Sequence, residues 1–151
     1  MKNSILHSVA EDLFSTLPLI GRSIRRKLLK TALTSFNEDI TPAHFEIMKL
    51  LEEAGTLHVA EIGGRLQIAG PQMTHLMDKL VDLNIVERHT GTEDRRTINI
   101  MLTNKGKTIL EEHDCHIRKA TRETLSCLTD EELRDLSASL RTLRDIFSKL
   151  E

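Results

Sequence analysis

The chain contains no tryptophan, no tyrosine and only four phenylalanines among its 151 residues. Modules that bind single-stranded RNA or DNA commonly stack bases on aromatic rings, so this composition argues against them. The two cysteines, Cys115 and Cys127, are too few for a disulfide framework or a zinc site built from cysteine alone. No apolar run approaches the roughly 20 residues of a membrane-spanning helix. The sequence therefore predicts neither a base-stacking module nor a disulfide-rich or membrane protein.

The chain also lacks an excess of positive charge, because its formal net charge is −2. That average hides an uneven distribution: residues 1–40 carry 6 basic and 4 acidic side chains, whereas residues 111–151 carry 7 and 10. Hydrophobic residues at 39% and charged residues at 29% are typical of a folded globular protein. A mildly acidic protein of this kind can still bind DNA where its positive charge is local.

Motifs of the common enzyme classes are absent as well. The sequence contains no glycine-rich phosphate loop, no His-Glu-x-x-His zinc motif and no nucleophile elbow. Residues 1–10 lack the basic head and apolar core of a secretory signal peptide. We therefore expect a cytoplasmic protein that is not an enzyme, formed by one domain or by one small domain with helical extensions.

The most informative stretch is residues 85–102. Two short runs of strand-forming residues flank a polar loop, which has Gly91 at its turn and ends in Asp94-Arg95-Arg96. Apolar and polar residues alternate in the second run, as expected of a half-buried strand. The pattern predicts a β-hairpin with arginines at its tip.

A helix–turn–helix pattern precedes this hairpin. Thr41 and Pro42 are typical of a helix start, and a short strand is expected over 57–59. A short helix over 60–66 is followed by a turn and by a helix over 71–82 with one apolar face. Helix–turn–helix plus an arginine-tipped hairpin indicates a winged helix, which can place a helix in one DNA groove and the tip in the next.

Amphipathic helices flank the winged helix. Apolar residues recur at helical spacing within 8–35, and a long helix is expected to begin at Thr103. The last helix carries a heptad seam of six apolar side chains, Leu133, Leu136, Leu140, Leu143, Phe147 and Leu150. Such a stripe needs a partner helix, so we expect 1–36 and 104–151 to form a helical dimerisation region and 37–103 a winged helix-turn-helix domain. The predicted fold is mainly α with a small β-hairpin wing.

Six motifs lie between residues 41 and 106, with amphipathic helices on both sides: Thr41-Pro42, Val59-x-Glu61-Ile62, the helix Gly70–Lys79, Leu80-x-x-Leu83-x-Ile85-Val86-x-Arg88, Asp94-Arg95-Arg96 and Leu102-Thr103-x-x-Gly106. Together they resemble the multiple-antibiotic-resistance regulator (MarR) family. The hairpin with Asp-Arg-Arg, followed by Leu-Thr-x-x-Gly, is the most specific part of the resemblance. The resemblance implies a homodimer that binds a pseudo-palindromic operator in double-stranded DNA, by default as a repressor.

The resemblance also implies which residues contact DNA. The helix 71–82 would enter the major groove, and its contacts to bases and phosphates would come from Pro71, Gln72, Thr74, His75 and Lys79. The wing would reach the minor groove, where Arg95 or Arg96 inserts while Asp94 pairs with a neighbouring arginine and orients the tip.

Two features depart from the family pattern. His75 stands where family members often carry an arginine, and Gly63-Gly64 lie where better helix formers are usual. Both departures concern which DNA sequence is preferred, and neither argues against DNA binding itself.

Small molecules, often aromatic acids, commonly release members of this family from DNA. By that resemblance, a carboxylate ligand could be held by Arg22, Arg25, Arg26 and His44. The same basic cluster can equally be a solvated helix face, and the chain has no Tyr or Trp to stack on an aromatic ligand.

A zinc-responsive regulator of the same fold is an alternative interpretation. Glu112, His113 and His116 lie close in sequence, and the two histidines share a helix face at i, i+3 spacing. The zinc-sensing branch of the family similarly uses histidines on the corresponding helix, although at i, i+4 spacing; an ordinary polar helix face is the other interpretation. The two cysteines are expected to be passive. Winged helices also serve as protein-interaction modules, which is the remaining alternative.

Overall fold

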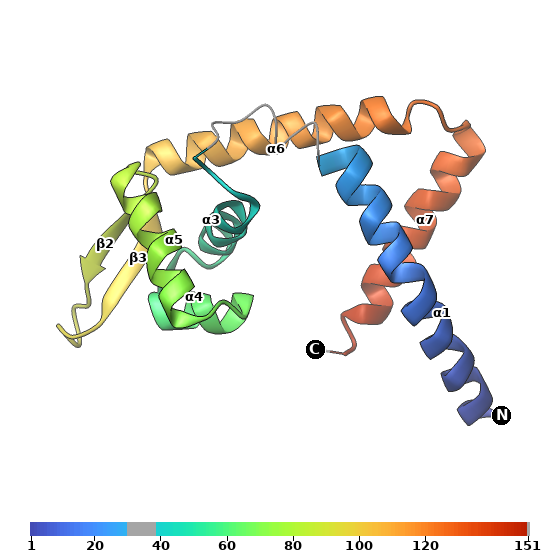
Figure 1. Cartoon of the computed structure of the whole chain (residues 1–151), viewed down its shortest axis with the longest axis horizontal. Coiled ribbons are helices and arrows are strands. Elements are labelled where there is room, and N and C mark those ends of the chain that lie inside the picture. The colour runs from blue at the N-terminus through green and yellow to red at the C-terminus, as the bar shows by residue number, and fades with distance from the viewer. Residues whose placement is uncertain (30–38, 151) are drawn as a thin grey trace. The chain divides into compact units, whose positions relative to one another are not determined.

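The computed structural model of the chain describes residues 1–29 and 39–150. Two compact units are present, Lys30–His116 and Met1–Leu29 with Ile117–Glu151, which we call the winged unit and the terminal unit. The winged unit contains α3 (Pro42–Ala54), β1 (Thr56–His58), α4 (Val59–Leu66), α5 (Gly70–Asp82), β2 (Val86–Thr90), β3 (Ile98–Leu102) and the first part of α6 (Asn104–Leu125) (Figure 1). The terminal unit contains α1 (Lys2–Ile24), the π-helical segment η1 (Arg25–Leu29), the rest of α6 and α7 (Asp130–Phe147).

Helix α6 belongs to both units, which differs from the boundary at residue 103 drawn from sequence. The physical reason is Leu110 of α6, which is fully buried in the core of the winged unit. The first half of the helix therefore helps to form the winged unit and is not only an extension beyond it.

The winged unit contains a three-stranded antiparallel sheet in the order β1-β3-β2. The predicted hairpin is confirmed: Val86 pairs with Leu102, and Thr90 pairs with Ile98 next to the loop. Strand β1 begins one residue earlier than expected and places Leu57 opposite Ile100 of β3. The mainly α fold with a small wing is thus confirmed, and the sheet behind the wing has a third strand.

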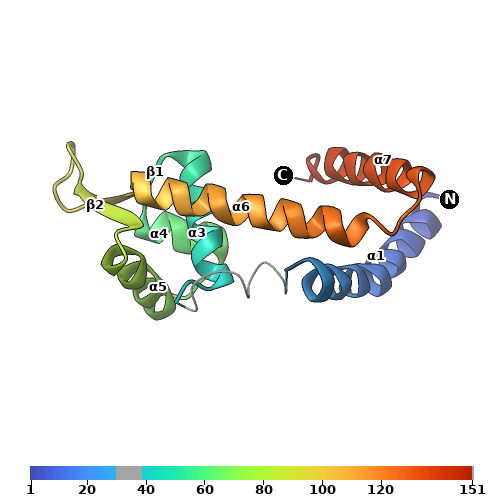
Figure 2. The same ribbon diagram turned by 90° about the horizontal axis from the view of Figure 1, so that it is seen from above.

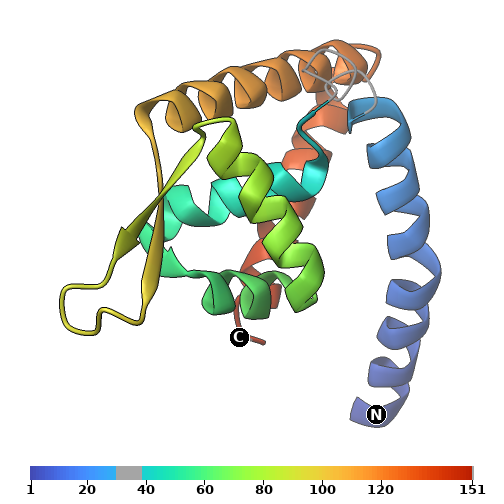
Figure 3. The same ribbon diagram turned by 60° about the vertical axis from the view of Figure 1, so that its left-hand side comes forward.

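One apolar core holds the winged unit together, with α3, α4 and α5 packed around it (Figure 3). Its fully buried side chains are Ile47, Met48, Leu51, Ile62, Met73, Met77, Leu80, Ile85, Ile100 and Leu110. Burying one such side chain stabilises the fold by roughly 1.5–3 kcal/mol relative to leaving it exposed. The buried methionines and leucines of α5 fix which face of that helix remains in solvent.

The Leu-Thr-x-x-Gly motif locks the start of α6 against the turn between α5 and β2. The Thr103 hydroxyl donates to the carbonyl of Asn84 at 2.7 Å, and it accepts from the Gly106 amide at 3.0 Å. A Cβ at Gly106 would collide with the Ile85 carbonyl oxygen, so only glycine permits this close approach. The motif therefore positions β2 and β3 relative to α5.

The terminal unit presents unpaired apolar stripes. Helix α1 begins at Lys2 and contains Pro18 without ending there; residues 30–35 of the predicted helix lie outside the described residues. Helix α7 begins with a capping box, since Thr129 Oγ1 accepts from the Glu132 amide at 3.2 Å. Leucines of the heptad seam are exposed in the single chain, for example Leu140 at 56%. Among the described residues, no helix combines the length and apolarity needed to cross a bilayer.

Candidate nucleic-acid interface

The face of α5 opposite the core carries the residues predicted to contact DNA. Its inward face is buried through Met73, Leu76, Met77 and Leu80. Four of its predicted contact residues are exposed, namely Pro71, Gln72, Thr74 and His75. The structure therefore gathers these side chains on one solvent-exposed surface, where a DNA groove could meet them.

Thr74 and Lys79 make contacts that limit how they can bind DNA. The Thr74 hydroxyl donates to the Gly70 carbonyl at 3.1 Å, which leaves its oxygen as an acceptor and its methyl group exposed. The Lys79 ammonium lies 3.3 Å from a carboxylate oxygen of Asp39, just before α3. A phosphate contact by Lys79 must therefore share or replace this ion pair.

An ion pair that the sequence did not predict joins the wing to α5. Arg88 Nη2 on β2 donates to Asp78 Oδ1 on α5 at 2.6 Å. The two residues flank the helix-to-strand turn, and their opposite charges were the only sequence signal for the pair. The pair fixes the orientation of β2 against the exposed face of α5.

Backbone-directed hydrogen bonds shape the loop of the wing. The Gly91 amide donates to the Thr97 carbonyl at 2.9 Å, and the Thr97 hydroxyl donates to the Asp94 carbonyl at 2.7 Å. A Cβ at Gly91 would lie 2.6 Å from the Asp94 carbonyl oxygen, closer than atoms pack, so the turn requires glycine. The loop extends beyond α4 and α5 (Figure 2, Figure 3).

The prediction that Asp94 pairs with a neighbouring arginine is wrong. Asp94 Oδ1 accepts the backbone amide of Arg96 at 2.9 Å instead, and no guanidinium pairs with this carboxylate among residues 39–150. A short carboxylate closes such a turn locally because the amide two residues on lies within its reach. Asp94 thus orients the tip through the backbone.

Arg95 and Arg96 are both exposed at the tip of the loop. Neither guanidinium takes part in an ion pair within the described part of the chain. Elsewhere on the hairpin, His89 Nε2 lies 2.9 Å from Glu87 Oε1. Two unengaged arginines on a projecting loop are suited to a narrow minor groove.

Gly63 has a packing reason that the sequence did not reveal. A Cβ at this position would lie 3.3 Å from the carbonyl oxygen of Ile68, so α4 approaches the turn before α5 closely there. A Cβ added at Gly64 would meet no atom within 4 Å. The two adjacent glycines therefore differ, and only the first lies in a tight approach to a neighbouring backbone atom.

His44 is buried, with 5% of its surface exposed, so it is not a ready ligand for a carboxylate. Its Nδ1 accepts the backbone amide of Thr41 at 2.9 Å, which caps the start of α3. Burial lowers the pKa of His44, and His75 and Lys79 lower it further. The other predicted effector residues, Arg22, Arg25 and Arg26, are exposed in the terminal unit, and their role stays a prediction.

The structure does not bring Glu112, His113 and His116 together. His113 is buried and stacks on Phe45 with ring centroids 3.5 Å apart, whereas Glu112 and His116 are exposed. Burial lowers the pKa of His113 despite its neighbour Asp114, whose carboxylate is engaged by the Lys49 ammonium. Within residues 1–29 and 39–150 no three His, Cys, Asp or Glu side chains form a group that could hold a metal ion. The metal prediction thus finds no support in the structure.

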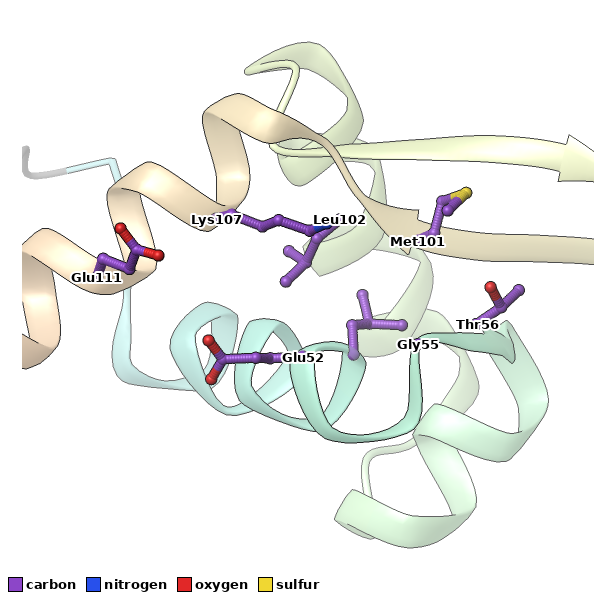
Figure 4. A pocket seen from close by; sticks show the side chains of 8 residues that line it. Glu52, Gly55, Thr56, Met101, Leu102, Lys107 and Glu111 are labelled. Carbon is purple, nitrogen blue, oxygen red and sulfur yellow. The ribbon is translucent and has the colours of Figure 1, made fainter.

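A surface pocket of about 210 Å³ lies at the junction of α3, the sheet and α6 (Figure 4). Leu51 and Leu102 form its apolar floor, and Glu52, Lys107 and Glu111 supply its charged rim. The pocket contains none of the residues predicted from sequence to hold an effector.

Comparison with known proteins agrees with this geometry. The MarR family model matches residues 40–98. The transcriptional repressor MdtR of Bacillus subtilis is 30% identical over 125 residues, covering 82% of this chain and 81% of its own length. A MarR family protein of Bacillus stearothermophilus has a solved structure with a TM-score of 0.75 and 27% identity, covering 94% of this chain and 96% of that one. For apo MarR of E. coli the TM-score is 0.73 at 26% identity, with 85% and 95% covered. On its winged helix, its motifs and these similarities, the chain belongs to the MarR family of transcriptional regulators.

Proposed function

We propose that the protein is a homodimeric repressor that binds a pseudo-palindromic operator in double-stranded DNA. The observation that carries the proposal is the placement of two DNA-suited surfaces on one compact unit. One is the exposed face of α5, and the other is the loop with Arg95 and Arg96. The ion pair between Arg88 and Asp78 joins the elements that carry them.

DNA recognition would follow from this arrangement. Helix α5 would enter the major groove with Gln72, Thr74 and His75 facing base edges and phosphates. An arginine of the wing would enter the adjacent minor groove, where a narrow groove concentrates negative potential. The protein would repress by occupying an operator that overlaps a promoter, and MdtR is itself named a repressor.

Dimer formation is supported by the apolar stripes of the terminal unit. Leu17, Ile20 and Ile24 of α1 are 43–46% exposed, and Leu136, Leu140 and Leu143 of α7 are 37–56% exposed. Apolar surface of this extent on two helices is costly in water and favours burial against a second copy. A dimer would place two copies of α5 on successive turns of DNA.

A small-molecule effector is part of the proposal. An anionic, aromatic-acid class of ligand fits the exposed cations Arg22, Arg25 and Arg26, which carry no ion pair among the described residues. Zinc is included in the test only as a comparison, because His113 and His116 do not form a metal-binding group within the described residues. We propose no enzymatic activity.

The proposal is tested with purified protein and a duplex from the region upstream of its own gene. A scrambled duplex of the same composition is the matched control, and several salt concentrations are compared because phosphate contacts release counterions. We expect preferential, steeply salt-dependent binding of one dimer per duplex, weakened by salicylate or altered by zinc if either is the effector. Absence of binding to any duplex at low salt would contradict the proposal.

A further inference from the structure

His44 caps the first turn of α3, and just before that turn Asp39 pairs with Lys79 of the recognition helix α5. The His44 ring is buried, since only 5% of the residue's surface is exposed. The backbone amide of Thr41 donates to Nδ1 at 2.9 Å, and the Thr41 hydroxyl oxygen lies at the same distance. An amide can donate only to an unprotonated ring nitrogen, so the cap requires neutral histidine with its hydrogen on Nε2.

The other ring nitrogen cannot easily accommodate a charge. His44 Nε2 is buried and has no hydrogen-bond partner among the described residues. A protonated imidazole is a double donor, so Nδ1 could no longer accept the Thr41 amide and could turn only to the Thr41 hydroxyl oxygen, while Nε2–H has no acceptor among the described residues. A proton on His44 would therefore disrupt the cap and leave a buried charge poorly solvated.

The groups facing His44 add to this effect. His75 and Lys79 of α5 both disfavour a positive charge on the ring. The nearby Asp39 carboxylate is already paired with Lys79. It therefore does little to offset a positive charge on His44. Both α5 groups are among the predicted DNA contacts, which connects the state of the buried ring to the DNA-facing surface.

We propose that neutral His44 positions the recognition helix, and that its protonation at acidic pH weakens operator binding. His44 is a positioning residue here, because its buried ring acts through α3 and α5 and does not touch DNA. The inference rests on the proposed DNA-binding function. The inference adds a pH-sensitive element inside the winged unit to that function.

The wild-type protein alone does not test this inference. A change of pH also alters the attraction of the protein to phosphate through groups other than His44. The informative quantity is the difference in pH profile between wild type and His44→Gln, because a glutamine amide oxygen can accept the Thr41 N–H without titrating. His7→Gln, on exposed α1 in the terminal unit, is the matched control.

Dissociation constants for one fixed duplex are measured at constant ionic strength from about pH 7.5 to 5.5. We expect wild type and His44→Gln to bind alike at the upper end. At the lower end wild type should bind at least about threefold more weakly than His44→Gln. For scale, a tenfold difference would mean that DNA binding changes the pKa of His44 by one unit. His7→Gln should follow wild type. Parallel profiles for wild type and His44→Gln would overturn the inference.

An NMR titration of the wild-type protein separates this inference from the proposed function, because it needs no DNA. The Thr41 amide and the amides of α5 around His75 should shift with the same midpoint as the His44 ring. In His44→Gln that transition should disappear. A Thr41 amide that does not follow the His44 ring would overturn the inference even if DNA binding is established. Failure to bind DNA with the NMR coupling present would instead contradict the proposed function.

Discussion

Arg88 of β2 and Asp78 of α5 are held together by a hydrogen bond of 2.6 Å between Nη2 and Oδ1. The two side chains are 43% and 54% exposed, so solvent screens their attraction. The pair therefore contributes mainly to orientation: it holds the wing in one direction relative to the exposed face of α5.

A double-mutant cycle with Arg88→Met and Asp78→Asn tests this role. We expect a coupling energy below about 1 kcal/mol in the free energy of unfolding, as for other exposed pairs. The coupling should fall at high salt, which screens exposed charges. Urea denaturation of the four proteins measures it. A coupling energy that is unchanged by salt would show that the two side chains interact by another route.

Gly91→Ala should disturb the loop of the wing. The added Cβ would press on the Asp94 carbonyl and the Thr97 side chain, and overpacking of this kind costs about 1–3 kcal/mol. Gly64→Ala is the matched control, because its Cβ meets nothing within 4 Å in α4. That control should stabilise the protein by up to about 1 kcal/mol. Chemical denaturation distinguishes the two, and a Gly91→Ala variant as stable as Gly64→Ala would contradict the described loop.

Much of the fold was predictable because its signals are local. Thr129 and Glu132 can form a capping box because both partners lie within one helical turn. The hairpin was predicted from alternating residues and a glycine turn, and Thr103 marked the start of the long helix that follows it. In each case the residues that decide the structure are neighbours in the sequence.

The site was predicted less completely because some of its contacts depend on packing. His44 looked like a ligand for anions, but its ring is buried and is influenced by His75 and Lys79 of α5, which lie about 30 residues further along the chain. Asp94 was expected to meet a guanidinium, whereas the geometry of its turn brings a backbone amide closer. His113 was grouped with His116 by spacing, yet its ring packs on Phe45 of α3.

Leu140→Asp in α7 should weaken the proposed dimer. This leucine is 56% exposed in the single chain and belongs to the heptad seam, where a carboxylate would be desolvated on association. Ser139→Asp, exposed and adjacent, is the control for added charge. Sedimentation should give a monomer for the first variant and a dimer for the second. A dimer of unchanged stability in Leu140→Asp would place the interface elsewhere.

Stability should fall as the pH decreases below about 6.5, the ordinary pKa of histidine. Burial lowers the pKa of both His44 and His113, so the unfolded chain takes up protons before the folded chain does. The contribution of the two neutral histidine rings to stability is complete above about pH 6.5. It is lost as the pH falls towards their lowered pKa values. Urea midpoints across this window measure it, and His44→Gln should show a shallower slope. A pH-independent midpoint would contradict the burial of both rings.

The central claim is that the wing and α5 form a DNA-binding surface, and one measurement tests it most directly. Binding of the wild type to its upstream duplex is compared with that of the double variant Arg95→Ala, Arg96→Ala over a range of salt, with exposed Arg134→Ala as control. We predict that the double variant loses most of its affinity, and that the slope of log affinity against log salt decreases by about 0.9 for each phosphate that is no longer neutralised. Equal affinity and equal slope for wild type and the double variant would contradict the account.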